Sequence, residues 1–301
     1  MQINSCITCI FFYILHIMTN KKYLNTKQVG NLFDVNESTV RRWATSGKIE
    51  CISSAGGHRK FSYQNVMNFA NTQGLKINSS EIPYNVNRKT VISDSINHVF
   101  KNDAKSLELI FVQLFLDGTP LTDLMDNYVE KILVEIQNKL DRREVSIAEE
   151  HIARKIVSKA LNNFKLTVSD SSSENKENIL CLNLENDIPD LPIDMIQILL
   201  ENKNYNVHNC GANTSIKDIK KLLSTKKYKA IFIYLCDRQC CTATVKDNLK
   251  KTNQDLNDIS VLAKKYNIEL YLGGPSFKNI DKDVLRSYKT FSKYSESLQI
   301  N

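Results

Sequence analysis

Apolar positions between residues 23 and 75 follow the period of two short helices and then that of a hairpin. Asn25 and Gln28 have the spacing of a capping box at the start of the first helix, and Asn36 precedes a second helix predicted over 37–46. The positions that would face the core are Val29, Leu32, Phe33, Val40 and Trp43. Two helices joined by a short turn in this way predict a helix-turn-helix.

Two extended runs follow the second helix and predict a β-hairpin. They lie on either side of Gly56 and Gly57 in the stretch KIECISSAGGHRKFS. Ser62 is then placed to cap one further helix. A hairpin beside a helix-turn-helix makes a wing, so residues 21–75 are predicted to form a winged helix-turn-helix domain.

The middle of the chain shows the helical period over residues 96–168. Thr119-Pro120 and the Ser146-Glu149 capping box mark two helix starts. The apolar positions on this period are Leu107, Ile110, Phe111, Leu114, Leu121, Leu124, Tyr128, Ile132, Ile136, Leu140, Ile152, Ile156 and Leu161. We predict a bundle of about four helices, preceded by a polar linker over 76–95.

The C-terminal part alternates between short apolar runs and helical stretches. The runs NILCLNL, NVHNCGA, KAIFIYL and IELYLGG are separated by helices predicted over 191–203, 215–225 and 248–266. This alternation predicts a parallel sheet with helices on both faces, a doubly wound, flavodoxin-like domain over 178–301. The predicted fold class is therefore multidomain, α and α/β.

The charge of the chain is concentrated at one end. The whole sequence has a net charge of +7, and the stretch from Met18 to Leu75 alone carries eight Lys and Arg residues against three acidic ones. A hydrophobic fraction of 42% is that of an ordinary globular protein. An excess of positive charge is compatible with an anionic partner. In this chain most of the excess lies on the segment that is predicted to form the winged domain.

Cysteine spacing disfavours a zinc site of the usual kind. The eight cysteines lie at positions 6, 9, 51, 181, 210, 236, 240 and 241, and Cys6 and Cys9 are the one pair with CxxC spacing, so no second pair completes a four-cysteine site. Free thiols in a reduced, cytoplasmic compartment are the expectation, with the adjacent Cys240-Cys241 pair as a redox candidate.

The opening apolar run, within residues 1–20, is too short to span a bilayer and lacks the basic start and cleavage site of a signal peptide. We interpret it as a start-site artefact or a disordered segment, with translation beginning at Met18, and expect no membrane association.

The second helix and the wing carry side chains that favour DNA binding. The N-terminal half of a recognition helix reaches base edges and phosphates in the major groove, and a wing tip approaches the backbone. The candidate DNA-binding residues are Ser38, Thr39, Arg41 and Arg42 on the helix and His58, Arg59 and Lys60 on the wing. A small helical domain with a solvated basic face is the alternative interpretation.

The segments STVRRW and GGHRKFS resemble the MerR family of transcription regulators. They match its Thr-Leu-Arg-x-Trp/Tyr pattern at the recognition helix and its Gly-x-Arg-x-Tyr-Ser wing. The resemblance implies a regulator of double-stranded operator DNA, although a phage-excisionase-type DNA binder shares this fold. Typical members continue into a long dimerisation helix. This chain shows no such heptad run, so a homo-oligomer, dimer or tetramer, would form through another part of the chain.

The stretch DRREVSIAEEHIARKIV resembles the helical cap above the cobalamin in light-responsive MerR-type repressors and corrinoid methyltransferases. Their pattern is a Trp, then a Gly, then a Glu-His pair that closes over the corrin. Glu150 and His151 match the pair, whereas Leu140 and Arg143 stand at the Trp and Gly positions. The alternative interpretation is that Glu150 and His151 are partly exposed helix residues.

The segments LLENKNYNVHNCGANTSIKDI and LYLGGPSF resemble cobalamin-binding domains, with Gly273 and Gly274 at their Gly-Gly turn. The family motif is Asp/Glu-x-His-x-x-Gly, whose His is the lower axial ligand of cobalt. By alignment it spans Asp187 to Pro192, and the ligand position is Pro189, which has no side-chain donor. We therefore assign no metal ligand, and expect cobalamin binding with a histidine ligand to be absent or badly weakened.

Two further positions depart from the cobalamin pattern. The Ser that ends the third strand in the family is replaced by Tyr234 or Cys236, depending on the alignment. His208 lies on the second strand and is interpreted as a structural or surface histidine. The candidate cofactor-binding residues that remain are Glu150, His151, Gly273 and Gly274.

These features predict a transcription regulator and not an enzyme, and the resemblance implies that it is a repressor. Its cobalamin-type module would serve self-association or sensing. Two alternatives remain open: the pocket is a docking surface for an antirepressor protein, or it still binds corrin without a lower His ligand. A corrinoid methyltransferase or mutase subunit is disfavoured because such chains need the His ligand.

Overall fold

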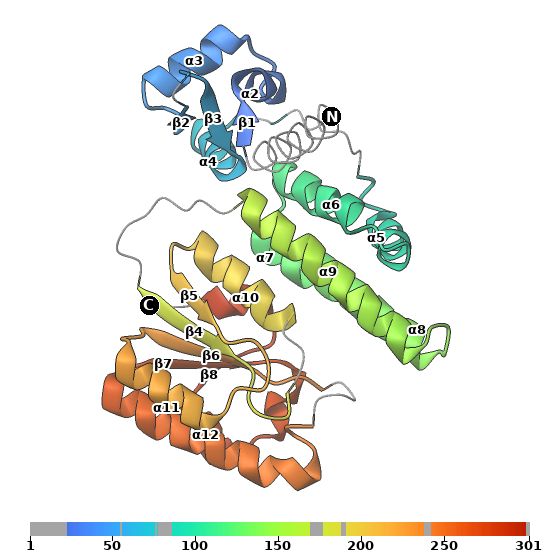
Figure 1. Cartoon of the computed structure of the whole chain (residues 1–301), viewed down its shortest axis with the longest axis vertical. Helices are drawn as coiled ribbons and strands as arrows, with labels where there is room; N and C mark the ends of the chain where they lie inside the picture. The colour runs from blue at the N-terminus through green and yellow to red at the C-terminus, as the bar shows by residue number, and fades with distance from the viewer. Residues whose placement is uncertain are drawn as a thin grey trace, which may run out of the picture. The chain divides into compact units, whose positions relative to one another are not determined.

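The computed structural model describes residues 23–54, 56–75, 77, 86–168, 177–187, 191–237 and 242–298 (Figure 1). The chain divides into two compact units, Met1–Pro120 with Val134–Ser171 and Leu121–Leu133 with Ser172–Asn301. The predicted start-site segment, residues 1–20, lies outside the described residues. Within the described part of the chain, no helix is both long and apolar enough to cross a membrane.

The first elements form a winged helix-turn-helix, as the sequence predicts. They are β1 (Tyr23–Asn25), α2 (Thr26–Leu32), α3 (Glu37–Thr45), β2 (Ile52–Ser53), β3 (Arg59–Ser62) and α4 (Tyr63–Gln73). The antiparallel sheet has the order β1-β3-β2, with Leu24 opposite Phe61 and Ile52 opposite Lys60. Strand β1 is not part of the prediction, because three residues are too few to show the period of a strand.

Capping chemistry starts two of these helices as predicted. The Gln28 amide donates to Asn25 Oδ1 and the Asn25 amide donates to Gln28 Oε1, both at 2.9 Å, which completes the capping box. At the start of α4 the Asn65 amide donates to Ser62 Oγ at 3.1 Å. Asn36 precedes α3 as predicted, but its side chain makes no capping hydrogen bond.

Three aromatic rings form the centre of the winged domain's core. The Trp43 ring centroid lies 5.7 Å from that of Phe33 and 4.8 Å from that of Phe69. Val40 and Phe61 are completely buried beside them. This packing holds α3 by its inner face, so its outer face is left exposed.

Four helical segments lie between residues 86 and 168, the number predicted. They are α5 (Val91–Phe100), α6 (Ala104–Leu116), a run of α7 (Leu121–Asp123), η2 (Leu124–Val129) and α8 (Glu130–Asp141), and α9 (Ile147–Val168). Helix α5 begins inside the segment 76–95 that the sequence predicts as a linker. Its buried residues Val91, Ile96 and Val99 are separated by polar residues, so the sequence pattern does not show that the helix already begins at Val91.

Helix α9 packs against α6 through a stripe that the apolar pattern only partly marks. Its buried positions are Ala153, Val157, Ala160, Leu161 and Phe164. Ile152, an apolar position of the predicted helix, is 50% exposed. The Phe164 ring centroid lies 6.1 Å from that of Phe111 and 6.0 Å from that of Phe115. Small residues in the stripe allow the close approach, and small residues contribute little to a hydrophobic pattern.

Asp103 caps α6, a largely buried helix, and provides a pH-dependent contribution to stability. Its Oδ1 accepts from the Ser106 amide at 3.0 Å, and its Oδ2 lies 3.2 Å from Nδ1 of His98. The hydrogen bonds from Ser106, with a smaller effect of His98, hold the pKa of Asp103 below its usual value of 3.8. We expect Asp103→Ala to lower the free energy of unfolding by about 1 kcal/mol at neutral pH, because the cap is lost.

The Asp103→Asn variant distinguishes the effect of the cap from the effect of the charge. An asparagine side chain also caps a helix well, but it carries no charge. A carboxyl whose pKa is lowered by folding contributes stability above its unfolded pKa and loses it as the pH falls through the folded pKa. Urea unfolding at about pH 7 and about pH 3.5 measures this. The difference in stability between the wild type and Asp103→Asn should shrink at the lower pH, and a constant difference would contradict the argument.

The C-terminal elements form the predicted doubly wound domain. They are β4 (Asn178–Leu182), α10 (Leu191–Asn202), β5 (Asn206–Asn209), α11 (Ile216–Thr225), β6 (Ala230–Tyr234), α12 (Lys246–Tyr266), β7 (Glu269–Gly273), η3 (Pro275–Asn279), α13 (Lys282–Leu285), β8 (Lys289–Phe291) and η4 (Tyr294–Leu298). The parallel sheet has the order β5-β4-β6-β7-β8, which is the flavodoxin-like order. Figure 1 shows α10 on one face of the sheet and α11 and α12 on the other.

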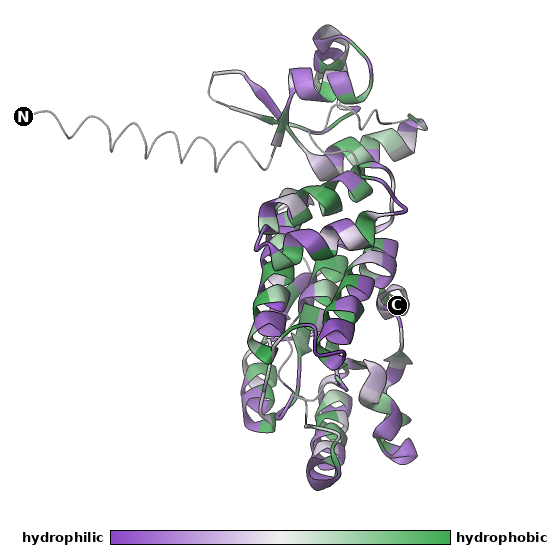
Figure 2. Cartoon of the chain, turned by 90° about the vertical axis from the view of Figure 1, so that its right-hand side faces the viewer, coloured by the Kyte–Doolittle hydropathy of each residue, from purple (hydrophilic) through white to green (hydrophobic). Residues whose placement is uncertain are grey.

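The sheet is buried because helices cover both of its faces. The side chains of β6 are all buried, and residues 179–182 of β4 are completely so. Helices show green and purple residues on different sides (Figure 2), as expected of helices with one buried stripe. The edge strand β8 is absent from the prediction, since its three residues KTF carry one buried side chain. The predicted fold class is confirmed.

Candidate functional site

A groove of about 480 Å³ lies in the winged domain between the starts of α2 and α3 and the tip of the hairpin. The residues that line it are Asn25, Thr26, Lys27, Glu37, Arg41, Gly56, Gly57, His58 and Arg59. It brings together Arg41, His58 and Arg59 of the candidate DNA-binding residues. Ser38, Thr39, Arg42 and Lys60 do not line it.

The tip of the wing is a tight turn that requires a glycine. The Gly57 amide donates to the Ser54 carbonyl at 2.8 Å, and the Ser54 amide donates to the His58 carbonyl at 2.9 Å. Gly57 has a φ of +74°, a left-handed conformation that glycine adopts without strain. The turn leaves the His58 side chain exposed at the rim of the groove.

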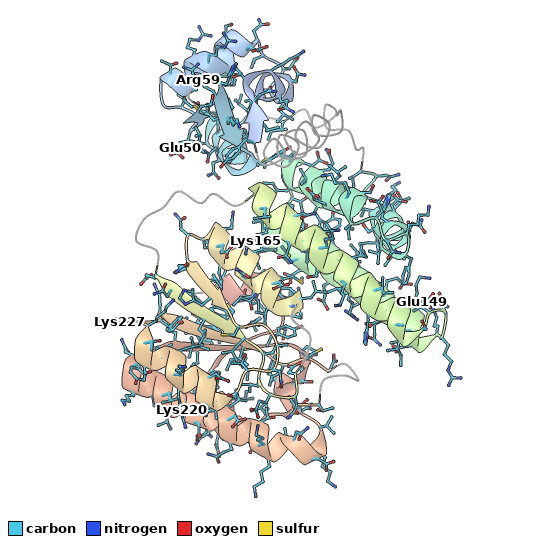
Figure 3. The ribbon with its side chains drawn as sticks, in the orientation of Figure 1. Glu50, Arg59, Glu149, Lys165, Lys220 and Lys227 are labelled. Carbon is cyan, nitrogen blue, oxygen red and sulfur yellow. The ribbon has the colours of Figure 1, made fainter. Side chains whose placement is uncertain are left out.

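Arg59 is held against the recognition helix by a hydrogen bond that the sequence does not reveal. Its Nη2 donates to Thr45 Oγ1 at 3.0 Å, and the Thr45 hydroxyl in turn donates to the Arg41 carbonyl at 2.9 Å. Figure 3 labels Arg59 beside α3. The wing arginine is therefore oriented before any ligand arrives, which reduces the entropy lost on binding.

The arginines of α3 each have a neighbour on the same helix. Arg41 Nη2 lies 3.3 Å from Glu37 Oε2, and Arg42 Nη2 donates to Thr39 Oγ1 at 3.5 Å. Both arginines are exposed, and Ser38 is exposed between them on the outer face of the helix. Three cations from three elements, Lys27, Arg41 and Arg59, thus line a groove that also contains one carboxylate.

Sequence reasoning missed Lys27 and Glu37 at this groove, and it missed Thr45 as the partner of Arg59. Lys27 carries a usable signal, because the Asn25 capping box places it in the first turn of α2. Glu37 is the first residue of α3 and could have been noticed as an acidic residue at a recognition-helix start. Thr45 could not be found this way, since its partner Arg59 is fourteen residues away in the sequence.

A second cavity, of about 490 Å³, lies in the C-terminal unit beyond the carboxyl ends of β6, β7 and β8. Its lining residues are Thr122, Asp123, Asp126, Asn127, Glu130, Tyr234, Gly274, Pro275, Phe277, Lys278, Ser292, Lys293, Tyr294 and Ser295. One wall is the π-helix η2 with its neighbours. π-Helical turns are rare and are often found at functional sites.

Tyr294 joins the two walls of this cavity. Asp126 Oδ1 accepts from the Tyr294 amide at 2.7 Å and Oδ2 from the Ser295 amide at 3.2 Å. The Tyr294 hydroxyl lies 3.3 Å from Glu130 Oε2. Its ring is parallel to that of Tyr234, with centroids 6.2 Å apart. The segment 121–133 is thus attached to the end of the sheet by side chains and amides of the chain itself.

Two buried hydrogen bonds cross the point where the strand order reverses, between β4 and β6. Asn183 Nδ2 donates to the Tyr234 carbonyl at 3.0 Å, and the Cys236 amide donates to Asp187 Oδ2 at 3.0 Å. Asn183 and Asp187 are completely buried. The first acidic residue of the family motif therefore ties two loops together.

The Gly-Gly turn after β7 has a packing role in this structure. A Cβ on Gly273 would lie 2.1 Å from the ring of Phe291. Gly274 has a φ of +95°, and a Cβ there would lie 2.2 Å from the Leu235 carbonyl oxygen. Of the two, only Gly274 lines the cavity. Both glycines are thus required by neighbouring parts of the chain, whatever the cavity binds.

Glu150 and His151 differ from each other in their surroundings, and both belong to the first unit. The Glu150 carboxylate is buried and forms an ion pair with Arg154. The prediction of a partly exposed Glu150 is wrong, because this pair draws it into the bundle. His151 is 60% exposed, with Nε2 3.7 Å from Glu150. Arg143, at the Gly position of the resemblance, has a φ of +58°, a conformation that glycine adopts more readily.

The residues described here do not fit a cobalt ion with a lower imidazole ligand. The described residues that line the cavity include carboxylate, amide, hydroxyl and lysine groups, and none of them is a histidine or a cysteine. Pro189, at the ligand position, lies outside the described residues. Pro192, at the Gly position of the family motif, is the second residue of α10, where a proline is well tolerated.

The remaining candidates for metal or thiol chemistry have structural partners. His208 Nδ1 lies 2.8 Å from the Tyr228 hydroxyl, and burial lowers the pKa of His208. Burial raises the pKa of the Cys181 thiol, which makes it unreactive. Among the described residues, Cys51, Cys181, Cys210 and Cys236 are free thiols, and no group of His, Cys, Asp or Glu side chains could hold a metal ion. Cys240 and Cys241 lie outside the described residues.

Comparisons with known proteins agree with the two halves of the chain. Residues 23–74 match the family described as Helix-turn-helix domain. The monomethylamine corrinoid protein of Methanosarcina barkeri is similar, with a TM-score of 0.51 and 11% identity over 71% of this chain and 98% of that one. At this identity the likeness shows the fold alone. No curated protein matches this chain.

Two further solved structures are similar at a TM-score of 0.33. One is the methanol:cobalamin methyltransferase complex of Methanosarcina barkeri, with 12% identity over 73% of this chain and 80% of that one. The other is a cobalamin-binding protein of Desulfitobacterium hafniense DCB-2, with 11% identity over 69% of this chain and 96% of that one. The chain thus carries a helix-turn-helix domain at its N-terminus and a cobalamin-binding-type α/β fold at its C-terminus.

Proposed function

We propose that this protein is a transcription regulator of the MerR type that binds operator DNA in the cytoplasm and represses its target genes. The observation that carries the proposal is the groove lined by Lys27, Arg41 and Arg59, which come from α2, α3 and β3. Cations from several elements around one groove suit a phosphodiester backbone. The match of residues 23–74 to a helix-turn-helix family supports DNA as the ligand.

We assign each contact to either the phosphates or the bases of DNA according to the position of the residue in the winged domain. Arg59 and Lys27 are assigned to phosphates, and the exposed face of α3 is assigned to the major groove. The other assigned contacts are Ser38, Thr39, Arg41, Arg42, His58 and Lys60. The sequence stretch that contains them carries most of the excess positive charge of the chain.

The α/β domain is proposed to act as an effector and oligomerisation domain. Two heads that read a palindrome would place their recognition helices about one helical turn apart, roughly 34 Å. Binding of one head raises the effective concentration of the second, so a dimer or tetramer binds an operator far more tightly than one head does. A change of assembly would then control repression.

This domain is proposed to work without cobalamin held by a lower imidazole. The donor groups around the cavity support this view, since the lining residues that the structure describes include no histidine. Two alternatives keep the same fold: a docking surface for an antirepressor protein, and corrin binding without a lower His ligand. We propose no catalytic role, because corrin chemistry of the methyltransferase kind relies on the missing ligand.

The test is a salt titration of DNA binding, with cobalamin as a second variable. An operator is first selected from a randomised duplex library, and affinity is measured by fluorescence anisotropy from about 50 to 200 mM salt. A dimer whose heads each neutralise three phosphates should give a slope of log K against log salt of about −5. Hydroxocobalamin should neither shift in absorbance nor co-elute with the protein. A flat salt dependence contradicts DNA binding, and co-elution contradicts the view of the α/β domain.

A further inference from the structure

Glu37 is an acidic residue in a groove that is also lined by three cations, Lys27, Arg41 and Arg59. Its side chain is 45% exposed, so it is open to a ligand in that groove. A carboxylate near DNA phosphates is repelled by them, and removing that charge would raise affinity for any duplex. If the groove binds DNA as proposed, an acidic group there weakens binding unless it makes a specific contact.

The position of Glu37 is that of a base-reading residue. It is the first residue of α3, and residues near the start of a recognition helix contact base edges. Arg41 stands one turn further along the same face, with its Nη2 3.3 Å from Glu37 Oε2. The pair therefore presents an acceptor and a donor side by side at the end of α3 that lines the groove.

The other cations of the groove are suited to phosphates rather than bases. Arg59 is anchored to Thr45 at 3.0 Å on the wing side, and Lys27 projects from the first turn of α2. Contacts from such flanking elements position a recognition helix, whereas base contacts determine specificity. This division leaves Glu37 and Arg41 for the bases.

We propose that Glu37 determines sequence specificity by accepting a hydrogen bond from the N4 amino group of a cytosine in the major groove, with Arg41 donating to a neighbouring guanine. This inference rests on the proposed function. A carboxylate only accepts hydrogen bonds, so it favours the amino group of cytosine and repels the acceptor atoms of guanine and thymine. Arginine pairs with O6 and N7 of guanine. The pair thus recognises a G·C-containing step and rejects other bases by repulsion.

Glu37→Gln changes the hydrogen-bonding pattern with little change in size. A glutamine side chain can donate to N7 and accept from N6 of adenine, which is the pairing that an adenine offers. Duplexes selected from a randomised library by the full-length wild type should contain a cytosine at one position of each half-site. Those selected by Glu37→Gln should contain an adenine there. Each protein should prefer its own duplex by about tenfold or more.

Glu50→Gln is the matched control. Glu50 is exposed and lies in the same domain, away from the residues that line the groove, and it is labelled in Figure 3. The Glu50→Gln variant loses the same charge as Glu37→Gln but keeps Glu37, so it should select the same DNA sequence as the wild type. Glu37→Ala, as a second variant, should lose the preference at that one position, keep it at the others, and bind random duplexes more tightly.

The outcomes separate this inference from the proposed function. If the wild type selects no sequence and binds duplexes without salt dependence, the proposed function fails. If the wild type selects a sequence and Glu37→Gln selects the same one, the proposed function stands and the role of Glu37 is overturned. Loss of all preference in Glu37→Ala would also overturn it, since a base contact affects one position.

Discussion

Replacing Arg59 with alanine is expected to weaken the binding of each winged head to every DNA duplex by about 10- to 100-fold at moderate salt. The reason is the loss of one charge-assisted hydrogen bond to a phosphate in each head, worth about 1.5–3 kcal/mol. Because a phosphate contact carries no sequence information, the loss should be uniform across sequences. The slope of log K against log salt should fall by about 1 for each head. Fluorescence anisotropy over a salt series measures both effects.

Lys227→Ala provides the charge-matched control for Arg59→Ala. Lys227 is exposed in the α/β domain and is labelled in Figure 3. It changes the net charge of the chain by the same amount as Arg59→Ala. If affinity follows net charge alone, the two variants should behave alike, and the wing would then have no special role. An unchanged salt slope in Arg59→Ala would contradict a phosphate contact.

Replacing Gly274 with alanine is expected to destabilise the C-terminal domain by about 3 kcal/mol or more. The backbone there has a φ of +95°, which costs an L-residue about 1–3 kcal/mol. A Cβ would also lie 2.2 Å from the Leu235 carbonyl oxygen. The Leu235 amide donates to the Gly273 carbonyl at 2.9 Å, so this backbone is not free to move away. The added methyl group therefore meets both an unfavourable backbone conformation and a steric clash.

Gly211→Ala is the control for the backbone conformation alone. Gly211 has a φ of +66°, but no atom lies within 4 Å of its Cβ position, so its cost should be about 1 kcal/mol. Trp43 is the single tryptophan of the chain, so its fluorescence follows the winged domain, whereas far-UV circular dichroism follows both domains. In urea, Gly274→Ala should shift the dichroism transition and leave the fluorescence transition in place. Equal effects of the two variants would show that the contact with Leu235 is unimportant.

Local chemistry accounts for the parts of the site that could be predicted. The capping box of Asn25 and Gln28, the Gly56-Gly57 turn and the cap at Ser62 are interactions among residues close in sequence. They place the recognition helix and the wing, and hence Arg41 and Arg59. The sequence therefore predicts which charged residues belong to the winged domain.

Long-range contacts account for the parts that could not be predicted. Thr45 is invisible as the anchor of Arg59 until the hairpin folds beside α3. The burial of Glu150 follows from its pairing with Arg154, which a pattern of apolar residues does not show. Tyr294 meets Asp126 across 168 residues of sequence. In each case the partner is chosen by the packing of elements rather than by spacing.

By itself, the sequence determined the order of the longer helices and strands, the fold class and the concentration of positive charge at the winged end. These depend on periodicity, turn residues and composition, which are local or additive properties of the chain. Only the tertiary structure decided which side chains share the groove with Glu37, why Gly273 and Gly274 are required, and how Tyr294 joins the two walls of the cavity beyond the sheet. The physical reason is that distances between atoms far apart in sequence are set by how the elements pack, and hydrogen bonds and steric contacts act only over a few ångströms.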